Sequence, residues 1–335
     1  MKKAPFLCLL VVALLVSCQK KTVKRTTDIT GKINNVSVII DDQLWNGEVG
    51  DSVRNKFASP VLGLPQEEPN FTLNQYPVKL LEGFMSNSRN IIVIKKSATS
   101  QFKIVSNEYV NPQVVVHISG RTVQELLDSI QSNDSLIIQA FKKSEIEVSQ
   151  KQILQDSVNY SQKLSEKFNI RIPIPIKYKM VMYGKKFVWF KKEITSGNVS
   201  LIFYELPFTS INPTKNVVNQ IVRKRDSVGT IYIHGAVPKT RMITEKAFSP
   251  YLSETKIYGK KTYETKGNWE LLHESMGGPF INYAIMDEKN NRILVIEGFC
   301  YAPSKKKRDL MFELEWLTVL GDKKLLRSGT WGDSM

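Results

Sequence analysis

Cysteine and histidine are scarce in this 335-residue chain, which has three of each. Cys8 and Cys18 lie at the N-terminus, in and just after an apolar run, so Cys300 is the single cysteine left for the folded part. One thiol excludes an intramolecular disulfide, and the stability of the fold must therefore come from its core. Because Cys300 lies in the apolar run 293–301, we expect it to be buried and unreactive.

The motifs of common metal and nucleophile sites are also missing. The histidines His117, His234 and His273 share no metal-ligand spacing, and Gly277 stands where a zinc helix beginning at His273 would need a second His. There is no Gly-x-Ser-x-Gly elbow, no CxxC pair and no glycine-rich phosphate loop. We therefore expect no metal, no cofactor and no catalytic residue, and an enzyme is the less favoured class.

No apolar run reaches the length of a transmembrane helix. Residues 4–16 are apolar, which is shorter than the roughly 18–20 residues that span a bilayer, and Lys2 and Lys3 precede them. This pattern is typical of a secretory signal sequence. It ends in Leu15-Val16-Ser17-Cys18, which resembles a bacterial lipobox. We expect residues 1–17 to be cleaved and Cys18 to carry lipid; an ordinary signal peptide with a chance cysteine is the alternative.

Residues 18–35 are polar and basic, which predicts a flexible tether. Gln19 follows the cysteine where inner-membrane retention would have Asp, so the expected location is the outer membrane. Lys20 and Lys21 stand where surface-exported lipoproteins often carry acidic residues, which favours a periplasm-facing orientation.

Basic residues outnumber acidic ones, giving a net charge of +15, or 15 − 2 = +13 without Lys2 and Lys3. In an exported protein this balance favours an envelope protein, anionic lipid or anionic glycan as a partner rather than nucleic acid. A dispersed basic surface that only aids solubility is the alternative.

The apolar content of 42% is ordinary for a folded protein. The hydrophobic pattern predicts a strand over 36–40, a long helical stretch over 121–168 with a break at 132–134, and an edge strand over 172–182. It also predicts a hairpin of 280–286 with 292–299, before a terminal helix. We expect an α+β fold of mixed and antiparallel sheets with packed helices, in two domains of similar size, 36–168 and 169–335. Their shared order of strands followed by a helix leaves open a duplicated unit.

Carboxylates gather in two short stretches, with Asp51 near Glu48 and Glu67 beside Glu68. Asp51, Glu67 and Glu68 are the candidate binding residues, and together with Glu48 they would serve a hydrolase acting on envelope glycan or peptide. Helix capping and solvation are the simpler explanation.

The triplet Asp-Ser-aliphatic recurs six times, where ordinary residue frequencies would give on the order of one. It resembles the O-glycan acceptor that one phylum of Gram-negative bacteria uses on exported proteins. The candidate acceptors are Ser52, Ser129, Ser135, Ser157, Ser227 and Ser334. Helix capping by Asp and Ser is the alternative.

Several stretches together resemble a family of predicted lipoproteins catalogued as domain of unknown function 4837. They are Leu44-Trp45-Asn46-Gly47-Glu48-Val49-Gly50-Asp51, Leu64-Pro65-Gln66-Glu67-Glu68-Pro69, Arg89-Asn90-Ile91, Gly277-Gly278-Pro279-Phe280, and Glu297-Gly298-Phe299 with Ala302-Pro303. The resemblance implies no activity, cofactor or catalytic residue, since the family is uncharacterised. We therefore expect a lipid-anchored cell-envelope protein that acts as a binding or assembly protein. A hydrolase acting on envelope glycan or peptide is the alternative.

Overall fold

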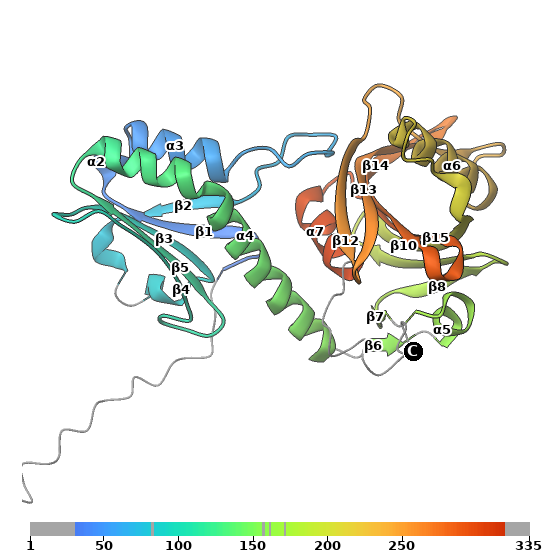
Figure 1. The fold of residues 1–335 in the computed structure, drawn as a ribbon, viewed down its shortest axis with the longest axis horizontal. Coiled ribbons are helices and arrows are strands. Elements are labelled where there is room, and N and C mark those ends of the chain that lie inside the picture. The colour runs from blue at the N-terminus through green and yellow to red at the C-terminus, as the bar shows by residue number, and fades with distance from the viewer. Residues whose placement is uncertain (1–30, 82–83, 156–157, 161, 171, 319–335) are drawn as a thin grey trace, which may run out of the picture.

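The computed structural model describes residues 31–81, 84–155, 158–160, 162–170 and 172–318, which form two α+β domains connected by a long helix (Figure 1). The expected signal sequence, the lipid site Cys18 and most of the tether lie outside the described residues. Ser157 and Ser334 lie outside them as well. Within the described part of the chain, no helix combines the length and the apolar character needed to cross a membrane.

The first domain is a mixed five-stranded sheet with the strand order β2-β1-β3-β5-β4, in which only β4 is antiparallel to its neighbour. Its strands are β1 (Asn35–Ile40), β2 (Thr72–Tyr76), β3 (Asn90–Lys96), β4 (Gln101–Ser106) and β5 (Val114–Gly120). The α-helices are α2 (Asp42–Trp45), α3 (Glu48–Phe57) and α4 (Val123–Gln155), and the short 3-10 helices are η1 (Val78–Leu80) and η2 (Phe84–Asn87). Alternation along β1 directs Val38 toward the core that contains Phe57 and Phe141, while Ile39 enters a smaller cluster with Met85.

Helix α4 runs unbroken through residues 132–134, so the expected break there is wrong. Ile130, Ile137 and Phe141 are fully buried and hold this part of the helix on the sheet. The polar residues that suggested a break find partners: Asn133 donates to the carbonyl of Ser129 at 2.8 Å, and Asp134 pairs with Lys56 of α3 at 2.7 Å. Packing of the apolar face therefore outweighs the weak helix propensity of these residues.

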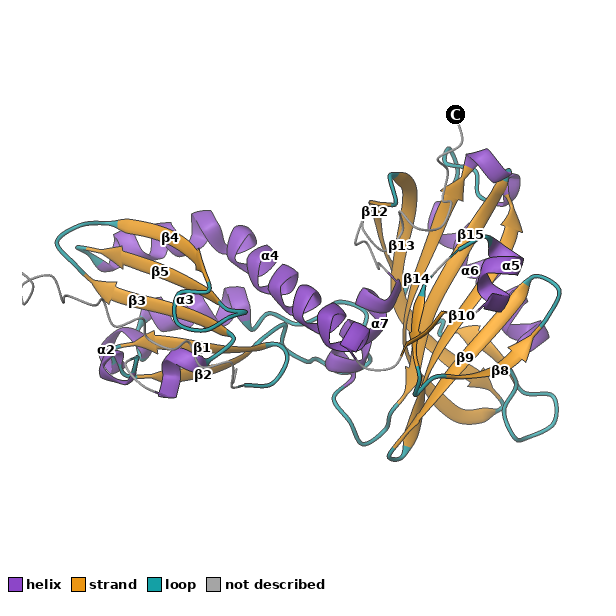
Figure 2. Cartoon of the chain, turned by 90° about the horizontal axis from the view of Figure 1, so that it is seen from below, coloured by secondary structure: helices purple, strands orange, loops and turns teal. Residues whose placement is uncertain are grey.

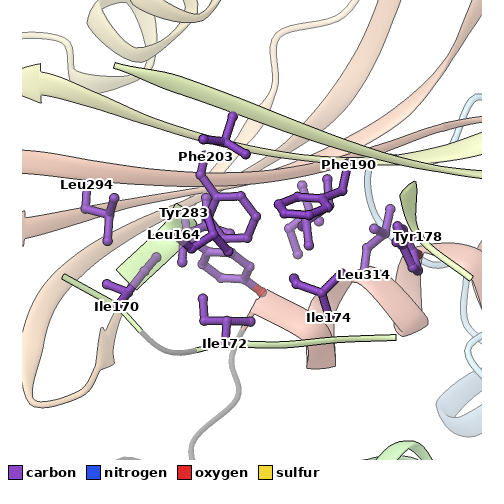
Figure 3. Close-up of a cluster of buried hydrophobic side chains, with 14 of the residues drawn as sticks. Leu164, Ile170, Ile172, Ile174, Tyr178, Phe190, Phe203, Tyr283, Leu294 and Leu314 are labelled. Carbon is purple, nitrogen blue, oxygen red and sulfur yellow. The ribbon is translucent and has the colours of Figure 1, made fainter. Parts of the chain in front are cut away.

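The border between the domains lies between α4 and β6 (Val158–Tyr160), not at residue 168 as expected. Leu164 and Phe168 of α5 (Gln162–Phe168) are fully buried in the core of the second domain, together with Tyr283 and Leu294. Figure 3 shows this core, which includes Leu164, Phe203 and Tyr283. The second domain therefore begins with β6 and α5.

The second domain is an antiparallel eight-stranded sheet with the order β11-β13-β14-β15-β10-β9-β8, and β12 also pairs with β13. Its strands are β8 (Lys179–Tyr183), β9 (Phe187–Ile194), β10 (Gly197–Pro207), β11 (Arg241–Thr244), β12 (Tyr251–Ile257), β13 (Lys260–Leu272), β14 (Glu274–Asp287) and β15 (Arg292–Tyr301). The other elements are β7 (Pro173–Pro175), which pairs with β6, the helices α6 (Val217–Tyr232) and α7 (Lys307–Thr318), and the 3-10 turns η3 (Phe208–Ser210) and η4 (Glu288–Asn290). Helix α6 covers one face of the curved sheet, and α5 and α7 lie on the other (Figures 1 and 2).

The α+β class with mixed and antiparallel sheets is confirmed, and so is the hairpin of β14 and β15. The duplicated unit is wrong, because the first sheet is mainly parallel and the second is antiparallel. The single strand expected over 172–182 is also wrong. A turn at 176–177 divides it into β7 and β8, so Ile172 and Ile174 are buried whereas Ile176 is 55% exposed.

Candidate functional site

The N-terminus of α7 contacts the first domain. The first backbone N–H groups of a helix have no partner within the helix, and a carboxylate satisfies them while also favouring the positive end of the helix dipole. Here that carboxylate is Glu68, on the first-domain loop after α3. Its Oε1 accepts from the N–H of Lys307 at 2.7 Å and its Oε2 from the N–H of Arg308 at 3.0 Å.

The side chain of Arg308 reinforces this contact. It is 5% exposed and donates through Nη1 to the carbonyl of Pro69 at 2.8 Å and to Oγ1 of Thr72 at 3.2 Å. The side-chain amide of Asn34 donates to Asp309 at 3.1 Å. The first turn of α7 is therefore held by polar groups of the first domain.

Helix α4 enters the same junction through Glu145, which is 1% exposed. Glu145 pairs with Arg89 at 2.7 Å, accepts from the amide of Asn90 at 2.8 Å and is hydrogen-bonded by the backbone of Asn34. Burial raises the pKa of this carboxyl, while the charge of Arg89 opposes the rise. Asn34 thus contacts α4 with its backbone and α7 with its side chain, which ties both helices to the start of β1.

A shallow groove lies beside this junction, with a cavity volume of about 50 Å³, or about 500 Å³ when the open space at its mouth is counted. It is lined by residues of both domains: Asn34, Val61, Leu62, Gly63, Leu64, Asn70 and Lys142 from the first, and Lys266, Phe280, Ile281, Arg308, Met311, Phe312 and Glu315 from the second. Gly63 allows the close approach of the two sides. Its φ is +82°, and a Cβ there would lie 3.0 Å from the Cβ of Lys266. We call this site the interdomain groove.

Three cationic side chains from three different elements line the interdomain groove. They are Lys142 of α4, Lys266 of β13 and Arg308 of α7. Burial would lower the pKa of Lys266, but the carboxylates of Glu315 and Glu264, 3.7 and 3.2 Å from its Nζ, hold that pKa above its usual value. Lys142 has no ion-pair partner among the described residues. Glu315 also lines the groove, and Arg308 pairs with Asp309 at 2.9 Å, so among the described residues Lys142 is the lining cation whose charge is not offset by an ion pair.

The structure does not bring the candidate carboxylates together in this groove. Asp51 is exposed on α3 and pairs with Arg54 at 2.7 Å, and Glu67 is exposed in the loop. Glu68 is engaged by the amides of α7. None of them, nor Glu48, lines the groove. Among the described residues, no group of three or more His, Cys, Asp or Glu is placed to hold a metal ion.

The described Asp-Ser serines all lie inside helices. Ser135 and Ser227 are exposed, on α4 and α6, whereas Ser52 and Ser129 are half-buried. The hydroxyl of Ser227 donates to the carbonyl of Arg223 at 2.8 Å. None of the four caps a helix start, and their modification stays a prediction.

Cys300 is fully buried in the core below the second sheet, as expected. Burial raises the pKa of its thiol to about 12, so the thiolate that a nucleophile requires is not formed near neutral pH.

Sequence reasoning missed a buried ion pair on the other face of the second sheet. Arg225 of α6 is 1% exposed and meets Glu297 of β15, which is fully buried, at 2.9 Å. Asn282 donates to the second carboxylate oxygen at 2.7 Å, and the guanidinium lies 3.9 Å from the ring centroid of Phe280. One signal could have found it. Arg225 lies four residues after Ile221 and therefore on the buried face of the helix.

Two family models match the chain. Residues 157–318 match the family model described as Domain of unknown function (DUF4837), and residues 29–154 match a second, described as Domain of unknown function (DUF8532). No curated protein matches the chain. The boundary between the two matches coincides with the structural border between α4 and β6.

Some solved structures are similar to parts of the chain. One is the Saccharomyces cerevisiae Ran-binding protein Mog1p, at 10% identity and a TM-score of 0.30, over 45% of this chain and 84% of that one. Another is the lipid transfer and protein localization domain of human StarD13 (DLC2), at 10% identity and a TM-score of 0.20, over 42% of this chain and 86% of that one. At these scores neither likeness carries an argument about function.

The family resemblance is thus confirmed for the second domain, while the three resembling stretches before residue 154 fall within the match to the second model. One confirmed stretch has a clear structural role. A Cβ at Gly298 would lie 2.8 Å from Leu314, so this glycine lets α7 pack closely on β15. The part of the chain from β6 to α7 thus matches the model of the family described as Domain of unknown function (DUF4837).

Proposed function

We propose that this protein is a lipid-anchored protein of the cell envelope that binds an amphipathic anion in the interdomain groove. One observation supports this above all: Lys142, Lys266 and Arg308 line the same groove as a wall of apolar side chains. Ligand sites favour domain interfaces and combine apolar walls with a few polar groups that fix orientation. The cations would hold the charged head of the ligand, and residues such as Leu62 and Met311 would cover its apolar body.

The hydrolase alternative has less support. General acid–base catalysis by two carboxylates needs both of them within reach of one bond. Both oxygens of Glu68 accept backbone N–H groups, and Asp51 is paired with Arg54 on an exposed helix surface. The groove instead offers cations, which bind anions but do not act as general bases while they remain charged.

Dodecanoate is a suitable probe for the groove, and titration calorimetry measures its affinity. We expect Lys142→Glu to weaken binding about tenfold or more, because the change replaces an attractive charge with a repulsive one close to the ligand's carboxylate. Lys143→Glu is the matched control: Lys143 is the neighbouring residue on α4, is exposed and does not line the groove.

Dodecyltrimethylammonium has the same apolar tail with a cationic head and should bind far more weakly than dodecanoate. Equal affinities for the two probes, or an equal loss in both lysine variants, would contradict the groove as an anion site.

The membrane anchor rests on the sequence, in which Ser17-Cys18 closes an apolar run. Replacing Cys18 with Ala should move the protein from the membrane fraction to the soluble fraction, since no thiol would remain to take the lipid. Cys8→Ala, within the same signal sequence, is the control and should leave the protein with the membranes. Immunoblotting of the separated fractions locates both variants. A Cys18→Ala protein that stays with the membranes would contradict lipid attachment at Cys18.

A further inference from the structure

Lysines and exposed apolar side chains gather where α5 lies beside the edge strand β8 (Figure 1). We call this surface the α5–β8 patch and define it by Lys163, Lys167, Val181, Tyr183, Lys185 and Lys186.

Close contacts join the members of the patch. The Nζ atoms of Lys163 and Lys167 lie 5.2 and 4.1 Å from the ring centroid of Tyr183. Lys167 also donates to the carbonyl of Lys185 at 2.9 Å, and Lys186 lines the same hollow as Lys167. Helix α5 and the β8–β9 turn thus present one continuous surface.

The charge of the patch is not balanced by the protein. None of its four lysines has an ion-pair partner among the described residues, whereas Lys191 and Lys192 on the adjacent strand β9 pair with Glu193 and Glu313. Glu166 is the acidic residue on α5, and it accepts from Gln162. Glu205 lines the same hollow as Lys167 and Lys186 but is paired with Arg292, so the four lysines leave the surface positive.

The same surface exposes apolar groups. Val181 is 48% exposed and Tyr183 is 45% exposed, two residues apart on β8. Tyrosine has an apolar ring with a polar tip, and lysine has an apolar stem with a charged head, so both suit the boundary between water and lipid.

Protection of a sheet edge explains only part of this pattern. Lysine on an edge strand discourages pairing with another chain, which accounts for Lys179 on β8. It does not account for Lys163 and Lys167, which lie on a helix, or for Lys185 and Lys186, which lie in a turn.

We propose that the α5–β8 patch docks the second domain on an anionic lipid bilayer surface. Its lysines meet the head groups, and Tyr183 and Val181 enter the interfacial layer. A soluble polyanion would satisfy the lysines but leave these two side chains in water, which is why a bilayer is the better occupant. The docking is independent of the interdomain groove and adds a second membrane contact to the N-terminal lipid.

The test uses the chain from residue 18 onward with Cys18→Ala, so that lipid attachment does not contribute. Cosedimentation with phosphatidylcholine vesicles, with and without phosphatidylglycerol, measures binding. We expect binding only to the anionic vesicles, and Lys163→Glu with Lys185→Glu should weaken it about tenfold or more. Lys95→Glu with Lys103→Glu is the matched control, since it changes the same charge at two exposed lysines of the first domain.

A third variant separates a bilayer from other partners. Val181→Ser keeps every charge and should still weaken vesicle binding, by several-fold. Binding to polyphosphate that is lost in the lysine variant, while Val181→Ser has no effect on vesicles, would identify a polyanion site and overturn the proposal. A concentration-dependent dimer in analytical ultracentrifugation that Val181→Ser abolishes would assign the patch to a second copy. An equal loss of vesicle binding in the patch variant and in the control variant would also overturn the proposal.

Discussion

Replacing Arg225 with Ala should destabilise the second domain by about 3–5 kcal/mol, because it leaves Glu297 buried without its partner. Glu297 is fully buried on a central strand, and Arg225 reaches it from α6. The guanidinium also donates to Oγ1 of Thr244 at 3.1 Å, which links α6 to β11 as well. Urea denaturation followed by tryptophan fluorescence measures the loss of unfolding free energy.

Two variants show whether this loss comes from the unpaired charge. Arg223→Ala, on the exposed side of the same helix, should cost less than about 0.5 kcal/mol. Combining Arg225→Met with Glu297→Gln removes both charges and keeps an acceptor for Asn282, so it should recover most of the stability. If Arg225→Ala lowers the free energy of unfolding no more than Arg223→Ala does, the ion pair does not position the helix.

The pH dependence of the Arg225→Ala variant follows from the carboxyl left behind. Burial raises the pKa of Glu297, and Arg225 opposes that rise in the intact protein. Without Arg225 the folded-state pKa rises further above the unfolded value of about 4.3. A carboxyl with a raised pKa contributes stability below its unfolded pKa and loses it as pH rises through the folded pKa. The deficit relative to the intact protein should therefore be larger at pH 8 than at pH 5.

Local patterns in the sequence were enough to predict several elements. The strand β1, the β14–β15 hairpin and the burial of Cys300 all follow from short apolar runs and a turn between them. These features depend on neighbours in the chain, which is the information that hydrophobic periodicity contains. The break expected in α4 failed because packing on the sheet, which local propensity does not include, decides whether a polar stretch stays helical.

The sites could not be predicted in the same way, because their partners are distant in sequence. Glu68 was a candidate binding residue, but its partners are backbone groups 239 and 240 residues further along the chain. Glu297 stands in a stretch that resembles the family, yet nothing local indicates that Arg225, 72 residues earlier, neutralises it. The interdomain groove likewise exists only because loop 61–64 and α7 meet. Tertiary contacts decide the role of each charged residue.

Replacing Glu68 with Ala should loosen the junction between the two domains. The amides of Lys307 and Arg308 lose a carboxylate that accepts from both, and loss of such a cap costs about 1–2 kcal/mol. Hydrogen exchange of the first turn of α7 should accelerate by roughly tenfold, because this free energy sets the population of the open form. Exchange followed by mass spectrometry measures it.

Glu67→Ala is the matched control, since Glu67 is exposed and adjacent to Glu68. Glu68→Gln keeps one acceptor oxygen and should lie between Glu68→Ala and the intact protein. Equal exchange in Glu67→Ala and Glu68→Ala would mean that the cap does not hold the domains together.

The same variant connects the junction to ligand binding. Leu62 and Gly63 line the groove from the loop that Glu68 anchors, and Met311 and Phe312 line it from α7. Glu68→Ala should therefore weaken dodecanoate binding and also accelerate exchange, whereas Lys142→Glu should weaken binding alone. Dodecanoate should in turn slow exchange at the start of α7 in the intact protein, because a ligand that contacts both domains stabilises their closed arrangement. Unchanged exchange at saturating dodecanoate would place the ligand elsewhere, while leaving the role of Glu68 in the junction intact.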